Sequence, residues 1–155
     1  PGSFDPITYG HLNILERALD IFSEVTLLVA LNPNKEPLFS LEESMGMISE
    51  AIGDRPHQVK VDFNDGLTVD YARQHNIRTA VRGLRAVTDF EHEFAMALTN
   101  RSLWPEFDTV FLMTKAEYMY LSSSVVRQVS QMGGEVDQFV PECVERRLRE
   151  KFGHI

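Results

Sequence analysis

Short apolar runs alternate along this chain with segments whose apolar residues recur every three to four positions. Four runs rich in β-branched residues predict strands at residues 25–31, 59–63, 79–83 and 109–113. One-face apolar spacing predicts helices at residues 13–22, 40–52, 68–75, 89–101, 122–132 and 141–152. Strands that alternate with helices are typical of a parallel sheet with helices on both faces. We therefore expect an α/β fold.

Polar and turn residues mark several of the helix ends. Ser40 and Glu43 have the spacing of a capping box, and Thr88 or Asp89 is the expected cap of the helix over 89–101. Pro141 suits the first position of the last helix. These signals support a continuous α/β pattern without repeats or linkers.

Length and composition fit one folded domain over residues 1–155. The formal net charge of -8 argues against a nucleic-acid partner, which normally meets a basic face. No apolar run approaches the length of a membrane span, so we expect no membrane partner. A single cysteine, Cys143, leaves no intrachain disulfide. These features predict a cytoplasmic protein.

The chain opens at a proline, directly on a loop rich in turn residues, PGSFDPITYGH. A loop of this kind normally follows a strand, so we expect that the first strand of the sheet is missing from the sequence. In open α/β sheets ligands bind at the carboxyl ends of the strands. The segments to examine are therefore those that follow strands, at residues 1–11, 32–40, 64–68, 82–90 and 114–124.

Two of these segments meet a helix start. Gly10 and His11 lie where free backbone N–H groups attract phosphate, although a simple capping turn gives the same pattern. Ser122, Ser123 and Ser124 add three hydroxyls at a second helix start. With Arg127 one turn later, they resemble a second phosphate cradle.

Two other segments carry cations. Lys35 lies between two prolines after a strand, where a solvated surface lysine is the simpler interpretation. Arg82 ends an apolar strand, so its guanidinium needs a partner: an anionic ligand, or a carboxylate of the following helix. The candidate carboxylates are those of Asp89, Glu91 and Glu93. Gly83 beside it permits a close approach.

Taken together, these segments resemble those of the class I nucleotidyltransferase superfamily and, within it, the bacterial phosphopantetheine adenylyltransferases. The matching stretches are PGSFDPITYGH, NPNKEPLFSLEE, GLTVDYA, RGLRAVTDFEHE and YLSSSVVRQV, in the family's order and at similar spacing. The resemblance implies a single-domain Rossmann-like parallel sheet. It also implies adenylyl transfer from ATP to 4'-phosphopantetheine, giving dephospho-coenzyme A and pyrophosphate in coenzyme A synthesis.

The resemblance assigns roles residue by residue. It implies catalytic roles for His11, Lys35 and Arg82, with His11 on the phosphates of ATP. It implies an ATP site made of Ser3, Phe4, His11, Gly83, Leu84, Arg85, Glu93, Tyr118, Met119, Tyr120, Leu121, Ser122, Ser123 and Ser124. It implies a site for the second substrate made of Ser3, Lys35, Leu67, Thr68, Arg82 and Asn100.

The resemblance further implies Mg²⁺, a homohexamer and feedback inhibition by coenzyme A. No carboxylates cluster at expected ligand positions, so we assign no metal-binding residue and expect Mg²⁺ to travel with ATP. Alternatives are a related enzyme with another acceptor, either a cytidylyltransferase or a nicotinamide mononucleotide adenylyltransferase, and a non-catalytic nucleotide-binding module. The RGLR stretch argues against the first two, and two separate phosphate sites argue against the third.

Overall fold

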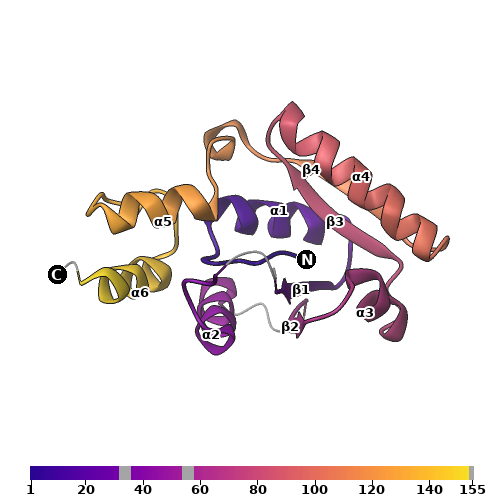
Figure 1. Cartoon of the computed structure of the whole chain (residues 1–155), viewed down its shortest axis with the longest axis horizontal. Coiled ribbons are helices and arrows are strands. Elements are labelled where there is room, and N and C mark those ends of the chain that lie inside the picture. The colour runs from indigo at the N-terminus through magenta and orange to yellow at the C-terminus, as the bar shows by residue number, and fades with distance from the viewer. Residues whose placement is uncertain (32–35, 54–57, 154–155) are drawn as a thin grey trace.

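Four parallel strands form the centre of the fold in the computed structural model, which describes residues 1–31, 36–53 and 58–153 (Figure 1). β1 (Val25–Ala30) pairs with β2 (Val59–Asn64), and β3 (Thr79–Leu84) pairs with β4 (Asp108–Met113). All four lie within a residue or so of the runs that the sequence predicts, because β-branched runs bounded by polar residues specify buried strands well. The expected α/β fold with parallel strands is confirmed.

The opening residues lie between these two strand pairs. The Gly2 N–H donates to the Leu28 carbonyl at 3.0 Å, and the Ala30 N–H donates to the Gly2 carbonyl at 2.9 Å, so Gly2 forms a parallel bridge alongside β1. From the other side, the Arg82 guanidinium of β3 donates to the Pro1 carbonyl. The opening loop is therefore fixed between the ends of β1 and β3.

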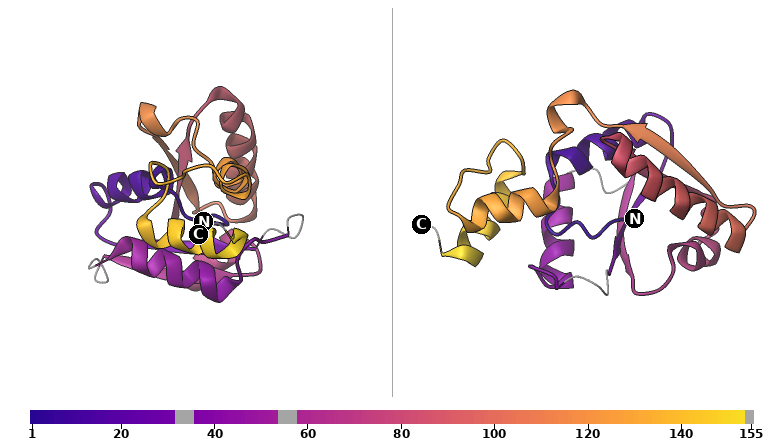
Figure 2. Two further views of the ribbon diagram at one scale, coloured as in Figure 1. Left: turned by 90° about the vertical axis from the view of Figure 1, so that its left-hand side faces the viewer. Right: turned by 45° about the horizontal axis from the view of Figure 1, so that its top comes forward.

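Helices surround the strands (Figures 1 and 2). α1 packs against β1, β3 and β4, α4 packs against β3 and β4, and α2 packs against β2 and α6. Their bounds are α1 Tyr9–Leu19, α2 Leu41–Ile52, α3 Thr68–Gln74, α4 Val87–Leu103, α5 Ser123–Gln131 and α6 Glu142–Phe152, with a short 3-10 turn at Ala116–Tyr118. None of the described helices combines the length and apolar character needed to cross a bilayer.

Helix ends show where local signals hold and where they fail. The capping box of Ser40 and Glu43 is confirmed, with reciprocal hydrogen bonds of 3.1 and 2.8 Å. The expected cap of α4 at Thr88 or Asp89 is wrong: the helix begins after Ala86, because the Asp89 carboxylate binds Arg85 instead. Pro141 is the N-cap of α6 and not its first helical residue.

The main core lies between α1, β1, α2, α5 and α6. Ile48, Val126, Val144 and Leu148 there expose none of their surface to solvent. A smaller cluster around Val69 and Phe107 joins α3 to β3. Neither core fills the space beside the opening loop, so a ligand can enter there.

Candidate active site

A pocket of about 840 Å³ lies between the two strand pairs, where residues 79–83 of β3 and residues 25–28 of β1 line it. Its wall combines the opening loop, the start of α1, the end of β3 and the segment before α5. The fold thus brings together three of the five segments that the sequence pattern singles out, those at residues 1–11, 82–90 and 114–124, with Thr68 from a fourth. The lining candidates are Ser3, Phe4, His11, Thr68, Arg82, Gly83, Arg85, Glu93, Leu121, Ser122, Ser123 and Ser124.

His11 is fixed by the cap of its own helix. The Thr8 N–H donates to His11 Nδ1 at 3.1 Å, and the His11 N–H donates to Thr8 Oγ1 at 3.4 Å. Because a backbone N–H can only donate, Nδ1 acts as the acceptor, and a neutral ring then carries its hydrogen on Nε2. This cap starts α1 at Tyr9, four residues before the predicted start. A threonine three residues before a histidine is the signal that could have revealed it.

The imidazole of His11 stays uncharged in this pocket. Burial is the largest cause, followed by the nearby Arg82 and Arg85 guanidiniums, and together they lower the pKa of His11 to about 4. The ring is therefore neutral near pH 7 and offers one N–H, that of Nε2, to a ligand. A neutral donor of this kind can bind a phosphate oxygen without transferring a proton.

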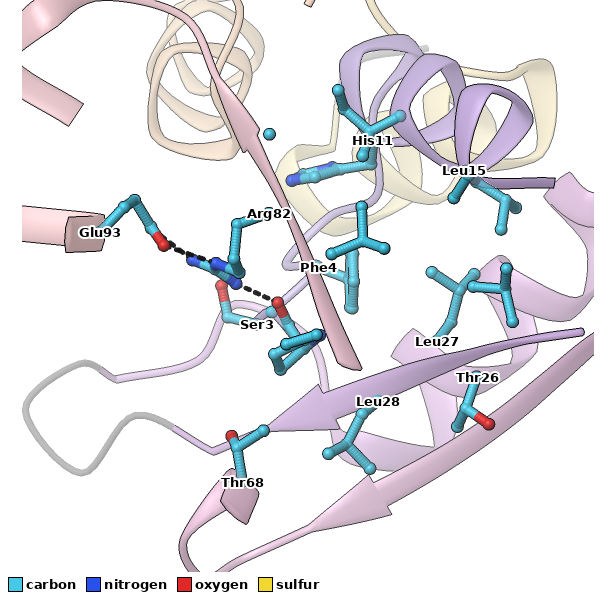
Figure 3. Close-up of a pocket in the computed structure, with 18 of the residues that line it drawn as sticks. Ser3, Phe4, His11, Leu15, Thr26, Leu27, Leu28, Thr68, Arg82 and Glu93 are labelled. Carbon is cyan, nitrogen blue, oxygen red and sulfur yellow. Dashed lines mark hydrogen bonds and ion pairs between the residues drawn. The ribbon is translucent and has the colours of Figure 1, made fainter. Parts of the chain in front are cut away.

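Phe4 holds the ring from the side. Its φ of 44° lies in the left-handed region, which bulky residues rarely adopt, and its side chain is buried. The Phe4 and His11 rings meet edge to face with centroids 5.1 Å apart (Figure 3). Gly2 leaves room for this arrangement, since a Cβ there would come within 3.1 Å of the Phe4 ring.

Arg82 lines the pocket and is also ion-paired. Its Nε donates to Glu93 Oε2 at 2.7 Å and its Nη2 donates to Glu93 Oε1 at 2.6 Å, so the contact is bidentate (Figure 3). The sequence left open whether a ligand or a carboxylate meets this cation, and Glu93 is the carboxylate that does. With a third donor on the Pro1 carbonyl, two of the five N–H groups of the guanidinium stay available for an anion.

Arg85 joins the β3–α4 corner to the segment before α5. Its Nε and Nη2 donate to the two oxygens of Asp89 at 2.9 and 3.1 Å, and its Nη1 donates to the Leu121 carbonyl at 2.8 Å. The guanidinium lowers the pKa of Asp89, so this carboxylate stays ionised. Arg85 therefore fixes the residue that immediately precedes the three serines.

The serine segment begins α5 as predicted. Ser122 Oγ accepts from the Val125 N–H at 3.2 Å as the N-cap, and Ser123 Oγ donates to the Pro6 carbonyl at 2.8 Å. Arg127 does not line the main pocket, because its Nη1 binds Asp5 Oδ2 at 2.8 Å. At the second phosphate cradle that the sequence predicts, the structure places hydroxyls and a helix N-terminus, with the Arg127 charge already paired.

Gly83 makes room for α1. A Cβ at this position would come within 2.8 Å of Ile14 Cγ1, closer than real side chains approach. The glycine thus lets the helix that carries His11 pack directly on the strand that carries Arg82. The close approach expected at Gly83 is therefore made by α1 of the same chain.

Other sites named by the sequence lie elsewhere. Lys35 lies outside the described residues. Of the described candidates, those absent from the pocket wall are Leu67, Leu84, Asn100, Tyr118, Met119 and Tyr120. Tyr120 is 88% exposed and Leu67 is 55% exposed, so a ligand or a second chain would have to reach them from outside this pocket. Their assigned roles stay predictions.

Comparisons with known proteins show which family the chain resembles. Residues 1–129 match the cytidylyltransferase-like family. The phosphopantetheine adenylyltransferase of Carboxydothermus hydrogenoformans is 52% identical over 152 residues, which are 98% of this chain and 93% of the relative. That of Desulforudis audaxviator is 53% identical over 153 residues, which are 99% and 93% of the two chains.

A solved structure shares the fold at much lower identity. The Plasmodium falciparum nicotinic acid mononucleotide adenylyltransferase complexed with NaAD matches with a TM-score of 0.66 and 14% identity, over 99% of this chain and 94% of that one. The chain therefore shares the fold of that protein. Because near-full-length relatives at about half identity share one name, the chain belongs to the phosphopantetheine adenylyltransferase family.

Proposed function

We propose that this chain transfers the adenylyl group of ATP to 4'-phosphopantetheine. An oxygen of the acceptor's terminal phosphate attacks the α-phosphorus of ATP, and the bond from that phosphorus to the β-phosphate oxygen breaks. The products are dephospho-coenzyme A and pyrophosphate. The observation that carries the proposal is that one pocket gathers His11, Arg82, Arg85 and the serine start of α5.

The reaction needs charge stabilisation and alignment more than acid–base chemistry. A phosphate monoester has a second pKa of about 6, so the nucleophile is largely a dianion at pH 7 and needs no base. Aligning two anions and stabilising the transition state are then the tasks of the protein. A neutral His11, guanidiniums and helix N-termini are suited to those tasks.

The roles follow from these positions. The His11 Nε2–H would donate to an oxygen of the α-phosphate, where charge grows in the transition state. The free N–H groups of Arg82 would hold the acceptor phosphate. Ser122 and the N-terminus of α5 would hold the departing pyrophosphate. Lys35 would join Arg82 on the acceptor, a role that stays a prediction.

Magnesium would enter with the nucleotide. Among the described residues, no group of three or more histidines, cysteines, aspartates or glutamates could hold a metal ion. We propose that Mg²⁺ arrives as part of the ATP substrate, held by its phosphates with water completing the coordination. No residue of this chain is assigned to it.

We propose further that the chain assembles into a homohexamer through α4. Phe90, Phe94 and Leu98 follow one another at four-residue intervals and are 43%, 47% and 54% exposed. An apolar stripe of this kind on a helix face is typical of an interaction surface, and a second copy of this chain is its proposed occupant. Light scattering should give about six times 17.7 kDa. Phe94→Glu should lower that mass, and Met132→Glu, at the exposed C-cap of α5, should not.

The direct test mixes the protein with ATP, Mg²⁺ and 4'-phosphopantetheine and follows dephospho-coenzyme A and pyrophosphate. Product formation supports the proposal. Turnover only with CTP, or only with nicotinamide mononucleotide as acceptor, would contradict it, and so would binding of ATP without any product. Added coenzyme A, which shares the acceptor's arm, should inhibit by competing with 4'-phosphopantetheine, in a reaction we place in the cytoplasm.

A further inference from the structure

Asp5 lies at a junction just outside the main pocket. It follows Phe4, and its side chain is only 12% exposed. Its Oδ2 accepts from Arg127 Nη1 at 2.8 Å and from the Leu38 N–H at 2.8 Å, and its Oδ1 accepts from the Phe39 N–H at 3.1 Å. One carboxylate thus joins three segments that are far apart in the sequence.

Two of these segments lead directly to the substrate pocket, and the third leads into α2 beside it. The opening loop carries Ser3 and His11, and the first turn of α5 follows the cap at Ser122. Leu38 and Phe39 end the connection from β1 and lead into α2. A second link, from Ser123 Oγ to the Pro6 carbonyl, runs beside the first.

Asp5 itself is placed to act through its neighbours. It does not line the main pocket, but it lines a small adjoining cavity of about 90 Å³ together with Ser3, Ser124 and Arg127. Its oxygens are directed to three donors of the protein, and charge-assisted bonds of this kind are stronger than neutral ones. The carboxylate therefore holds neighbouring groups and does not itself reach a substrate.

We propose that Asp5 is a positioning residue for adenylyl transfer, a proposal that rests on the proposed function. Its carboxylate holds the start of α5 and the segment before α2 against the opening loop. The distance between the α-phosphate donor, His11, and the pyrophosphate site at Ser122 depends on this junction. Arg127 is the counter-ion of Asp5, so its charge is neutralised and is not available to a phosphate at the start of α5.

The variant Asp5→Asn isolates the charge with little change in size. The amide keeps one accepting oxygen but loses the charge and one acceptor, leaving Arg127 without its partner. A misplacement of reacting groups by about 1 Å can cost about 10²-fold in rate. We expect kcat to fall by about tenfold or more, with each KM within about threefold of wild type, because alignment suffers more than binding.

A double-mutant cycle with Arg127→Gln tests whether the two residues act as a unit. The double variant should lose no more kcat than Asp5→Asn alone. The matched control is Glu145→Gln, which removes a carboxylate from an arginine pair of 2.6 Å on α6 and should leave kcat unchanged. If Asp5→Asn does not fold, Arg127→Gln alone must show the kcat loss.

A purely structural role predicts a different result. It would lower the melting temperature of Asp5→Asn while kcat, measured well below that temperature, stayed within twofold of wild type, and this would overturn the proposal. A rise in the KM for ATP alone, or additive losses in the cycle, would overturn it as well.

The proposed function and this proposal can fail separately. Wild-type turnover is measured first, and its absence would count against the function alone. Deuterium exchange then tests the junction without turnover, because the backbone N–H groups of Leu38 and Phe39 should lose protection in Asp5→Asn and keep it in Glu145→Gln. Unchanged protection of both would overturn the proposal whatever the activity.

Discussion

The β3–α4 corner and the opening loop offer a phosphate group two different surfaces. At the corner, Arg82 and Arg85 are cations, but each is already bound by a carboxylate of α4. At the opening loop, the donors are a neutral imidazole and the N-termini of α1 and α5. In the proposed function, one region would bind anions through spare donors of paired charges, and the other through fixed dipoles and neutral N–H groups.

The difference would allow a chain of net charge -8 to accept the two anions of the proposed reaction. Pairing each arginine keeps the empty pocket from carrying several unpartnered cations, which would be costly to desolvate. On the neutral side the donor itself carries no charge, so its contact adds little ground-state attraction for the reacting phosphate. Binding and rate should therefore respond to different residues.

The largest effect should come from the neutral side. His11→Ala is expected to lower kcat by about 10² to 10³-fold, the scale of losing one transition-state donor, with little change in ATP binding. Steady-state kinetics with both substrates measures this. Thr8→Val is the control, because it removes the hydroxyl of the cap and keeps the imidazole. An unchanged turnover number in His11→Ala would remove His11 from the mechanism.

Gly83→Ala should force the two regions apart. The new Cβ would meet Ile14 Cγ1 at 2.8 Å, so α1 must shift on β3, at a cost of about 1–3 kcal/mol in the free energy of unfolding. Urea denaturation measures the cost, and kcat should fall as well. Adding Ile14→Ala should destabilise the Gly83→Ala protein less than it destabilises wild type. If Ile14→Ala lowers the free energy of unfolding equally in wild type and in Gly83→Ala, the contact between residues 14 and 83 does not cause the loss.

Stability should depend on pH through His11. Its folded pKa of about 4 lies below the unfolded value, so between the two the unfolded state binds more protons and stability falls as pH falls. From pH 7 to pH 5 this group should cost about 2 kcal/mol in the free energy of unfolding. Urea titrations of wild type and His11→Gln measure it, and the variant should lose less stability. If the stability of both proteins falls equally with pH, the low pKa of His11 in the folded state is contradicted.

At the corner the expected changes are smaller and concern binding. Glu93→Gln removes one of the two carboxylate oxygens that accept from Arg82 and should raise the KM for 4'-phosphopantetheine about tenfold, or about 1.4 kcal/mol, with the KM for ATP unchanged. Asp89→Asn should instead raise the KM for ATP, since it frees Arg85. Titration calorimetry checks both. A shift of the ATP constant in Glu93→Gln would support the nucleotide role that the family resemblance implies.

Strands and helices could be predicted from this sequence because each depends on neighbours in the chain. The period of apolar residues placed all four strands correctly, and Ser40 with Glu43 located the start of α2. The start of α4 was misjudged for a reason that is not local. Asp89 looks like a cap in sequence, but Arg85 competes for its carboxylate and wins through three hydrogen bonds.

The site was predictable as a region and less so as a set of contacts. Parallel strands bring their carboxyl ends together, so the segments that form the pocket followed from topology. The partner of Arg82 did not, since Asp89, Glu91 and Glu93 all lie within reach in sequence. The bond from Asp5 to Arg127 spans 122 positions, and no periodicity connects residues so far apart.

The hydrogen bonds that cap α1 restrict the protonation of His11. Its Nδ1 is occupied by the Thr8 N–H, so a proton arriving there would displace the bond that starts the helix. His11 is therefore poorly suited to transfer protons, although histidines do so in many enzymes. A substrate that needed deprotonation would find no help here, and chemistry that starts from an already ionised nucleophile is what such a residue can serve.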